Sequence, residues 1–151
     1  TKESEWYEDA VNMKGVQVGE NLREHNQGIA KILIMDLSLQ HVQEIMDKFH
    51  QRFWDSLQCQ NSDPSHVEIM APGVSKANAV LKLADMYNIK PEEIAAIGDS
   101  GNDVSMLKLA GTGIVVANAN AVARAAAEYQ VASNDDNGVA EAIDRFFYHA
   151  L

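Results

Sequence analysis

The stretch from residue 94 to residue 103 reads IAAIGDSGND and predicts a short buried strand that leads directly into a helix. Ile94–Ile97 is apolar throughout, as expected for a strand that is covered on both faces of a parallel sheet. Gly98 ends the strand, and the helix is expected to begin near Asn102. This order places Asp99 at the carboxyl edge of the sheet, where open α/β folds build their ligand sites.

Outside this stretch, short apolar runs alternate with helical periods, which is typical of βα units on a parallel sheet. The C-terminal half is expected to form helices over 74–88, 102–109, 119–127 and 139–147 and further strands over 113–117 and 129–132. The N-terminal part predicts helices over 1–13 and 40–53 and strands over 30–35 and 66–70. We therefore predict an α/β fold in which residues 1–70 form a small α+β domain. Residues 71–151 would form a Rossmann-like three-layer unit, because Pro72-Gly73 is a natural break.

Asp99 and Asp103 are four residues apart in the strand-to-helix turn and can share one hard cation. Mg²⁺ prefers oxygen ligands, commonly one or two carboxylates with water and phosphate. Asn102 adds a neutral amide that reaches a phosphate oxygen without repelling it. The alternative is an ordinary capped turn, because Asp, Ser, Asn and Gly all favour turns and helix caps.

Lys76 lies in the first turn of the helix predicted over 74–88, with Ser75 as its expected cap. A cation is unfavourable at this end of a helix dipole. The position therefore suggests a role for Lys76 outside the helix, and a solvated surface lysine is the alternative. Its combination with the acidic turn favours a site that neutralises a phosphoryl group.

Bulk composition excludes several classes of protein. Twelve Lys and Arg against twenty-two Asp and Glu give a formal charge of −10, which would repel a phosphate backbone, so nucleic acid is not an expected partner. No apolar run is long enough to span a membrane, and no secretory signal is visible. The single Cys59 permits no internal disulfide. We therefore expect a cytoplasmic protein without a membrane partner.

Two segments resemble motifs of the haloacid-dehalogenase superfamily, in particular its Cof-like branch of sugar and cofactor phosphatases. Residues 68–76 (EIMAPGVSK) are similar to the third motif, and residues 97–107 (IGDSGNDVSML) are similar to the fourth. The resemblance continues through 110–111, 116–119 and 133–140, in the order and spacing of the family. It covers about residues 65–147 and implies a partial core preceded by part of an α+β cap domain.

The resemblance also implies roles for individual residues. Asp99 would bind Mg²⁺ directly, and Asp103 would support the metal either directly or through another ligand. Asn102 would touch the phosphoryl group, and Lys76 would neutralise the nucleophile and the transferring phosphate. Asn118, in the turn after a strand, is expected either to shape the pocket wall or to serve only the turn. The implied reaction is hydrolysis of a small phosphorylated metabolite, such as a sugar phosphate, through an aspartyl-phosphate.

The family's first motif, Asp-x-Asp followed by x-Thr or x-Ser, and its second motif do not appear in this sequence. Asp36, after the apolar run 31–35, is the alternative nucleophile, but it leaves too little room before Lys76 for a second motif and an inserted cap. We therefore expect this chain to be inactive alone. A non-catalytic metal-binding remnant and a sugar phosphomutase are the competing readings. The missing strand also predicts an exposed sheet edge, covered by a homodimer or by a retained N-terminal segment.

Overall fold

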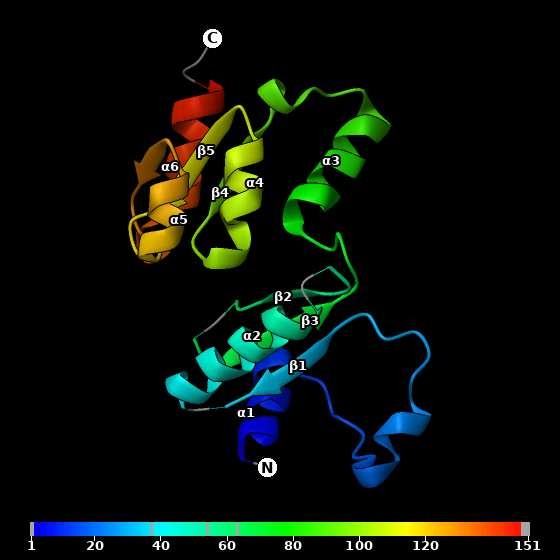
Figure 1. The fold of residues 1–151 in the computed structure, drawn as a ribbon. Helices are drawn as coiled ribbons and strands as arrows, with labels where there is room; N and C mark the ends of the chain where they lie inside the picture. Colours follow the sequence, from blue (N-terminus) through cyan, green and yellow to red (C-terminus); the bar gives the residue numbers. More distant parts are fainter. Residues whose placement is uncertain (1, 37, 54, 63, 149–151) are drawn as a thin grey trace. The chain divides into compact units, whose positions relative to one another are not determined.

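The computed structural model describes residues 2–36, 38–53, 55–62 and 64–148 (Figure 1). The chain divides into two compact units, Thr1–Pro72 and Gly73–Leu151. The sequence placed the boundary after residue 70. Over the described residues, no helix combines the length and the apolar character needed to cross a membrane. Each unit is described by itself below.

The N-terminal unit is built on a three-stranded antiparallel sheet with the order β1-β3-β2. Its elements are α1 (Lys2–Val11), a 3-10 helix (Gly19–Glu24), β1 (Ile32–Met35), α2 (Leu39–Phe53), β2 (Gln58–Gln60) and β3 (His66–Met70). The predicted helices and strands of this unit are all present. Strand β2 was not predicted, because its sequence Gln-Cys-Gln holds a single apolar residue and lacks a strand pattern of its own.

Helix α2 covers one face of this sheet. Apolar residues at helical spacing, Val42, Ile45, Met46 and Phe49, pack against Cys59, Val67 and Ile69 of the strands. Val67 and Ile69 are alternate residues of β3 and therefore lie on the same face. Burial of this face stabilises the unit in the usual way for an amphipathic helix on a sheet.

The opposite face of β3 carries a buried carboxylate, Glu68. Its Oε1 accepts hydrogen bonds from Lys31 Nζ at 2.7 Å and from Ser62 Oγ at 2.9 Å, and its Oε2 accepts from Gln60 Nε2 at 3.4 Å. Burial alone would raise the pKa of Glu68. The hydrogen bonds from Lys31, Ser62 and Gln60 outweigh burial, so the pKa of Glu68 lies below its ordinary value. Glu68 is therefore a charged group whose folded environment favours ionisation.

We expect Glu68→Gln to destabilise the N-terminal unit by about 1–2 kcal/mol at about pH 7, because Lys31 loses its counter-charge. A lowered folded-state pKa contributes stability that is present above the unfolded value and is lost as the pH falls through the folded value. The difference between the parent and the variant should therefore shrink towards about pH 3. Urea unfolding followed by tryptophan fluorescence measures it, because both tryptophans, Trp6 and Trp54, lie in this unit.

Glu44→Gln is the matched control, since Glu44 lies on the exposed side of α2. Its effect on the unfolding midpoint should be small at both pH values. A destabilisation by Glu68→Gln that is equal at both pH values would contradict the role given to the Glu68 charge.

The C-terminal unit is built on a three-stranded parallel sheet with the order β4-β5-β6. Its elements are α3 (Lys76–Tyr87), a 3-10 turn (Pro91–Glu93), β4 (Ala95–Gly98), a 3-10 turn (Gly101–Asp103), α4 (Val104–Leu109), β5 (Thr112–Val116), α5 (Ala121–Ala126), β6 (Tyr129–Val131), a 3-10 turn (Asn134–Asp136), α6 (Gly138–Ile143) and a π turn (Asp144–Tyr148). The predicted helices and strands of this unit are present. The last helix differs from the prediction of one helix over 139–147. The α-helix ends at Ile143, and the chain continues as a π-helix over Asp144–Tyr148.

Strand β5 is the centre of this unit. Its residues Gly113–Val116 are all buried, which requires both faces of the strand to be covered. Helices α4 and α5 lie on one face of the sheet and α6 lies on the other (Figure 1). The core comprises Ala96, Leu107, Ile114, Val115, Val116, Ala119, Ala123, Val131 and Ala142. This is the three-layer α/β arrangement that the sequence predicts.

Candidate functional site

The turn after β4 is organised by the carboxylate of Asp103. Its Oδ2 accepts hydrogen bonds from the backbone N–H groups of Asp99 at 2.9 Å and Ser100 at 3.1 Å. A Cβ added at Gly98 would lie 2.6 Å from the Cβ of Asp103, so only glycine allows this close approach. Asp103 is 2% exposed and closes the turn against the end of the strand.

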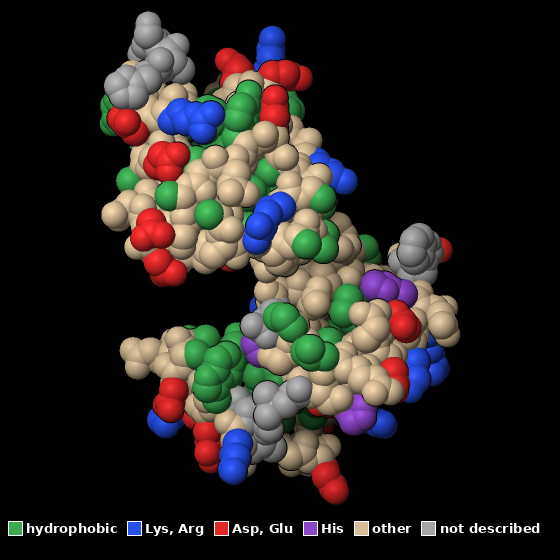
Figure 2. Space-filling view, turned by 90° about the vertical axis from the view of Figure 1, so that its left-hand side faces the viewer, with side chains coloured by type: hydrophobic (Ala, Val, Ile, Leu, Met, Phe, Trp, Pro, Cys, Tyr) green, Lys and Arg blue, Asp and Glu red, His purple; other side chains and the backbone are tan. Residues whose placement is uncertain are grey.

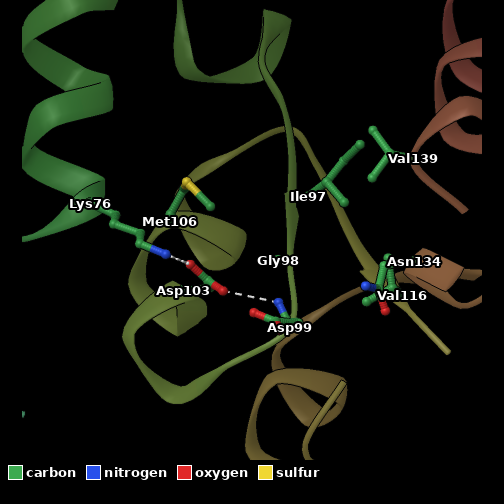
Figure 3. Close-up of a pocket in the computed structure, with 9 residues that line it drawn as sticks. All are labelled: Lys76, Ile97, Gly98, Asp99, Asp103, Met106, Val116, Asn134 and Val139. Carbon is green, nitrogen blue, oxygen red and sulfur yellow. Dashed lines mark hydrogen bonds and ion pairs between the residues drawn. The ribbon is translucent and has the colours of Figure 1, made fainter. Parts of the chain in front are cut away.

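Lys76 reaches the same carboxylate from α3. The helix begins at Lys76 because the Ser75 Oγ caps it, accepting from the Asn78 N–H at 3.1 Å. Lys76 Nζ donates to Asp103 Oδ1 (Figure 3). The Lys76 side chain is 49% exposed and the Asp103 side chain 3% exposed. The ammonium group is therefore anchored on its protein side and remains accessible to a ligand.

The hydrogen bonds to Asp103 decide its ionisation. Burial disfavours the charged carboxylate and would raise its pKa. The hydrogen bonds from Lys76, Asp99 and Ser100, together with the positive charge of Lys76, more than offset burial and hold the pKa of Asp103 below its ordinary value. Asp103 is therefore an anion at neutral pH, and both of its oxygens are engaged by the protein.

Asp99 differs from Asp103 in the freedom of its carboxylate. Its backbone is fixed, because its C=O accepts from the Asn120 N–H at 2.8 Å and its N–H donates to Asp103. Its side chain forms no hydrogen bond or ion pair with any other described residue. The structure thus presents one carboxylate that is held in place by its backbone and is open to a ligand.

Asp99, Asp103 and Lys76 share a groove of about 450 Å³ at the carboxyl edge of the sheet (Figure 3). The residues that line it are Lys76, Ile97, Gly98, Asp99, Asp103, Met106, Val116, Asn134 and Val139. The polar groups lie at one end and the apolar side chains Ile97 and Val139 lie along the strand. A groove of this size fits a small ligand with one anionic group.

Asn134 is a lining residue that sequence reasoning missed. It follows β6, and its backbone N–H donates to Asn118 Oδ1 at 3.2 Å, while Asn118 Nδ2 donates to Asn134 Oδ1. This amide pair ties the turn after β5 to the loop after β6. The available signal was that all three parallel strands end at the same edge, where polar turn residues meet. Asn118 does not itself line the groove but holds Asn134 in position.

Two other residues singled out from the sequence lie apart from this lining. Asn102 is not among the groove-lining residues, and its Oδ1 is buried without a hydrogen-bond partner among the described residues. Asp36 lies in the N-terminal unit after β1. Its Oδ1 accepts from the Ser38 N–H at 2.8 Å and its Oδ2 pairs with His41 Nδ1 at 3.2 Å. Asp36 thus organises the start of α2.

The carboxylate oxygens near β4 suit Mg²⁺ bound through few protein ligands. Mg²⁺ is commonly bound by one or two carboxylates, with water and substrate phosphate completing its ligands. Asp99 offers an unengaged carboxylate, whereas three of the about four acceptor positions of the Asp103 carboxylate are taken by Lys76 and two N–H groups. No cluster of three or more His, Cys, Asp or Glu side chains suited to a metal occurs among the described residues. The set therefore fits an ion that keeps most of its water.

An open carboxylate, an anchored lysine and a groove at the carboxyl edge of a parallel sheet form a candidate small-molecule site in an α/β protein. The chain belongs to the haloacid dehalogenase-like hydrolase family, because the sequence profile of that family matches residues 1–143. The match includes the N-terminal unit as well as the segments that carry the resemblance in the sequence.

Individual relatives agree with this assignment. The chain is 30% identical over 115 residues to the 5-amino-6-(5-phospho-D-ribitylamino)uracil phosphatase YbjI of Escherichia coli. This match covers 76% of this chain and 42% of that protein. It is similar to a haloacid dehalogenase-like hydrolase structure from Bacteroides thetaiotaomicron, with a TM-score of 0.75 and 31% identity, covering 93% of this chain and 52% of that one. The chain thus spans about half the length of these relatives.

One match has a different name. The chain is 34% identical over 120 residues to the protein called Endoribonuclease YBEY, chloroplastic, from Arabidopsis thaliana. The match covers 80% of this chain but only 20% of that protein, so its name describes a much larger molecule. On the face shown in Figure 2, Lys and Arg side chains are dispersed among Asp and Glu and form no continuous basic surface over the described residues.

Because Asp103 is buried and hydrogen-bonded and Asp99 is not, substitutions of the two aspartates should affect stability differently. Asp103→Asn should destabilise the C-terminal unit by about 2–3 kcal/mol, because Lys76 loses its partner and one side-chain oxygen cannot replace two. Asp99→Asn should change stability by about 0.5 kcal/mol or less, since its carboxylate forms no hydrogen bond or ion pair with a described residue. Hydrogen exchange of peptides that cover β4 and α4, followed by mass spectrometry, measures both effects. Equal losses of protection in the two variants would contradict this assignment.

Proposed function

We propose that this chain carries the metal-binding and lysine part of the active site of a Mg²⁺-dependent phosphatase. The observation that supports it is the arrangement of Lys76, Asp103 and Asp99 in one groove, with one carboxylate engaged and the other open. The names of two relatives, the phosphatase YbjI and a phosphoglycolate phosphatase from Natronomonas pharaonis, agree with this proposal.

Each residue has a separate task in this proposal. Asp99 would hold Mg²⁺, which when bound stabilises negative charge on a phosphoryl group. Lys76 would place its ammonium against the same group, with Asp103 fixing the position of the amine. Asn134 would border the phosphoryl pocket as a neutral group. Because the donors are fixed before the ligand arrives, they would stabilise the charge of the transition state without reorganising.

The substrate class follows from the size and polarity of the groove. A small metabolite with a phosphate monoester fits, because the anionic end would meet Lys76 and the remainder would lie along Ile97 and Val139. The relatives named above act, by their names, on phosphate esters of a ribityl compound and of glycolate. We therefore propose a small phosphorylated metabolite of the sugar-phosphate kind.

This proposal assigns no nucleophile to the chain. Covalent phosphoryl transfer needs an activated attacking group, and the sequence offers no Asp-x-Asp motif to provide it. Asp36 is engaged at the start of α2. We therefore propose that this chain alone binds metal and phosphate and hydrolyses phosphate esters slowly or not at all.

Titration calorimetry with Mg²⁺ tests the metal part. Asp99→Asn should weaken Mg²⁺ binding at least about 10-fold, which corresponds to about 1.4 kcal/mol. Asp135→Asn is the matched control with the same charge change in the loop after β6, and it should leave the affinity within about 2-fold. Lys76→Met should retain Mg²⁺ binding and weaken Mg²⁺-dependent binding of inorganic phosphate about 10-fold. Equal Mg²⁺ affinity in the parent and in Asp99→Asn would refute the metal site.

Two other readings make different predictions for the same proteins. A remnant without a ligand site predicts no Mg²⁺ binding that depends on Asp99. A phosphomutase predicts that phosphate moves from a phosphosugar to a sugar acceptor faster than to water. Release of phosphate from an aryl phosphate, measured with and without a sugar acceptor, separates transfer from hydrolysis.

A further inference from the structure

The loop from residue 117 to residue 120, between β5 and α5, ties two residues of the groove to one another. The Asn120 N–H donates to the Asp99 C=O at 2.8 Å, and the amide of Asn118 pairs with Asn134. Asp99 and Asn134 both line the groove, although they follow different strands, β4 and β6 (Figure 3). A contact that fixes this loop therefore also positions two residues of the groove.

Arg124 of α5 holds this loop by one backbone carbonyl. Its Nε and its Nη2 both donate to the Ala119 C=O, at 2.9 Å and 2.7 Å. Hydrogen bonds from a charged donor are stronger than those between neutral groups. Ala119 is 1% exposed, whereas Arg124 is an exposed residue, so burial of the arginine does not explain this arrangement. A surface arginine without a structural task would extend into solvent, since holding it in one conformation costs side-chain entropy.

The carbonyl that Arg124 holds belongs to the same peptide group as the N–H that holds Asp99. This group joins Ala119 to Asn120. A trans peptide group is planar, so its C=O and its N–H point in opposite directions and turn together. By fixing the direction of the C=O, the guanidinium fixes the direction of the N–H that reaches Asp99. Hydrogen bonds in such a row also polarise and strengthen one another.

We propose that Arg124 is a positioning residue of the groove, which orients the backbone of Asp99 through the peptide group that precedes Asn120. The Asp99 N–H is held independently by Asp103, so the two hydrogen bonds fix the residue from both ends. The outer partners of a metal ligand set its direction and thereby the affinity for the metal. The link to Mg²⁺ rests on the proposed function, whereas the orientation of Asp99 does not.

Hydrogen exchange of single amides, measured by NMR without metal, tests the orientation. Arg124→Met removes both donors and keeps an unbranched side chain that suits a helix. We expect the Asn120 amide hydrogen to exchange at least about 10-fold faster in this variant, because its hydrogen bond to Asp99 is no longer held in line. The Glu128 amide, which donates to the Gly113 C=O at 3.0 Å beyond the other end of α5, should exchange as in the parent. A general loosening of α5 would accelerate both.

The affinity for Mg²⁺ gives a second measurement, in which the sign of the change is informative. Loss of a positive charge from the unit should by itself raise the affinity for Mg²⁺, since repulsion between two cations is removed. The positioning role predicts the opposite for Arg124→Met, a loss of at least about 3-fold by titration calorimetry, because Asp99 is no longer directed at the metal. This loss should be smaller than that of Asp99→Asn, which removes the charged ligand itself.

Lys108→Met is the matched control for Arg124→Met. It removes one positive charge from an exposed residue in the last turn of α4. Lys108 forms no hydrogen bond or ion pair with any other residue that the structure describes. Both the exchange rate of the Asn120 amide and the affinity for Mg²⁺ should therefore stay within about 2-fold of the parent.

Two results would overturn the proposal. One is an Asn120 amide that exchanges in Arg124→Met as slowly as in the parent, or that loses protection only together with the Glu128 amide. The other is an unchanged or raised Mg²⁺ affinity in Arg124→Met, when Asp99→Asn does lower that affinity. If Asp99→Asn leaves the affinity unchanged, the metal site fails, and exchange of the Asn120 amide still decides on the role of Arg124.

Discussion

The carboxylate of Asp103 joins two parts of the C-terminal unit that are distant in the sequence, the start of α3 and the turn after β4. One oxygen holds the ammonium of Lys76 at the start of α3, and the other holds the N–H groups of Asp99 and Ser100 at the end of β4. Removing this one group would leave a lysine without a counter-charge and a turn without its hydrogen bonds. Such a loss is costly in a buried place, because the remaining partners stay desolvated and unpaired.

The same interaction gives two aspartates of one turn different chemistry. In the sequence, Asp99 and Asp103 are equivalent carboxylates four residues apart. In the structure, Asp103 is buried and neutralised by Lys76, whereas the Asp99 carboxylate is unengaged. The charge of Asp103 therefore positions a cation, and the charge of Asp99 is available for a metal. One carboxylate then suffices for Mg²⁺, which retains water readily and does not require a cage of protein ligands.

Sequence patterns predicted elements whose cause is local. Ser75 begins α3 as its cap, and Asn88 ends it with the left-handed φ of 54°, both as expected from residue type. Features that depend on distant partners were missed. Strand β2 exists because the edge of β3 pairs with it, since Gln58–Gln60 has no strand pattern. The amide pair of Asn118 and Asn134 depends on the closeness of two loops that follow different strands, which no spacing in the sequence indicates.

The groove lies at the border of the described sheet, so the pairing of the strands there decides which residues surround it. A site at the carboxyl edge of a parallel sheet is furnished by the residues that follow adjacent strands. Strand β5 has neighbours on both sides, but β4, which carries Asp99, has one only on the side of β5 among the described strands. The turn after β4 therefore contributes to a site that is walled on one side by β5 and β6.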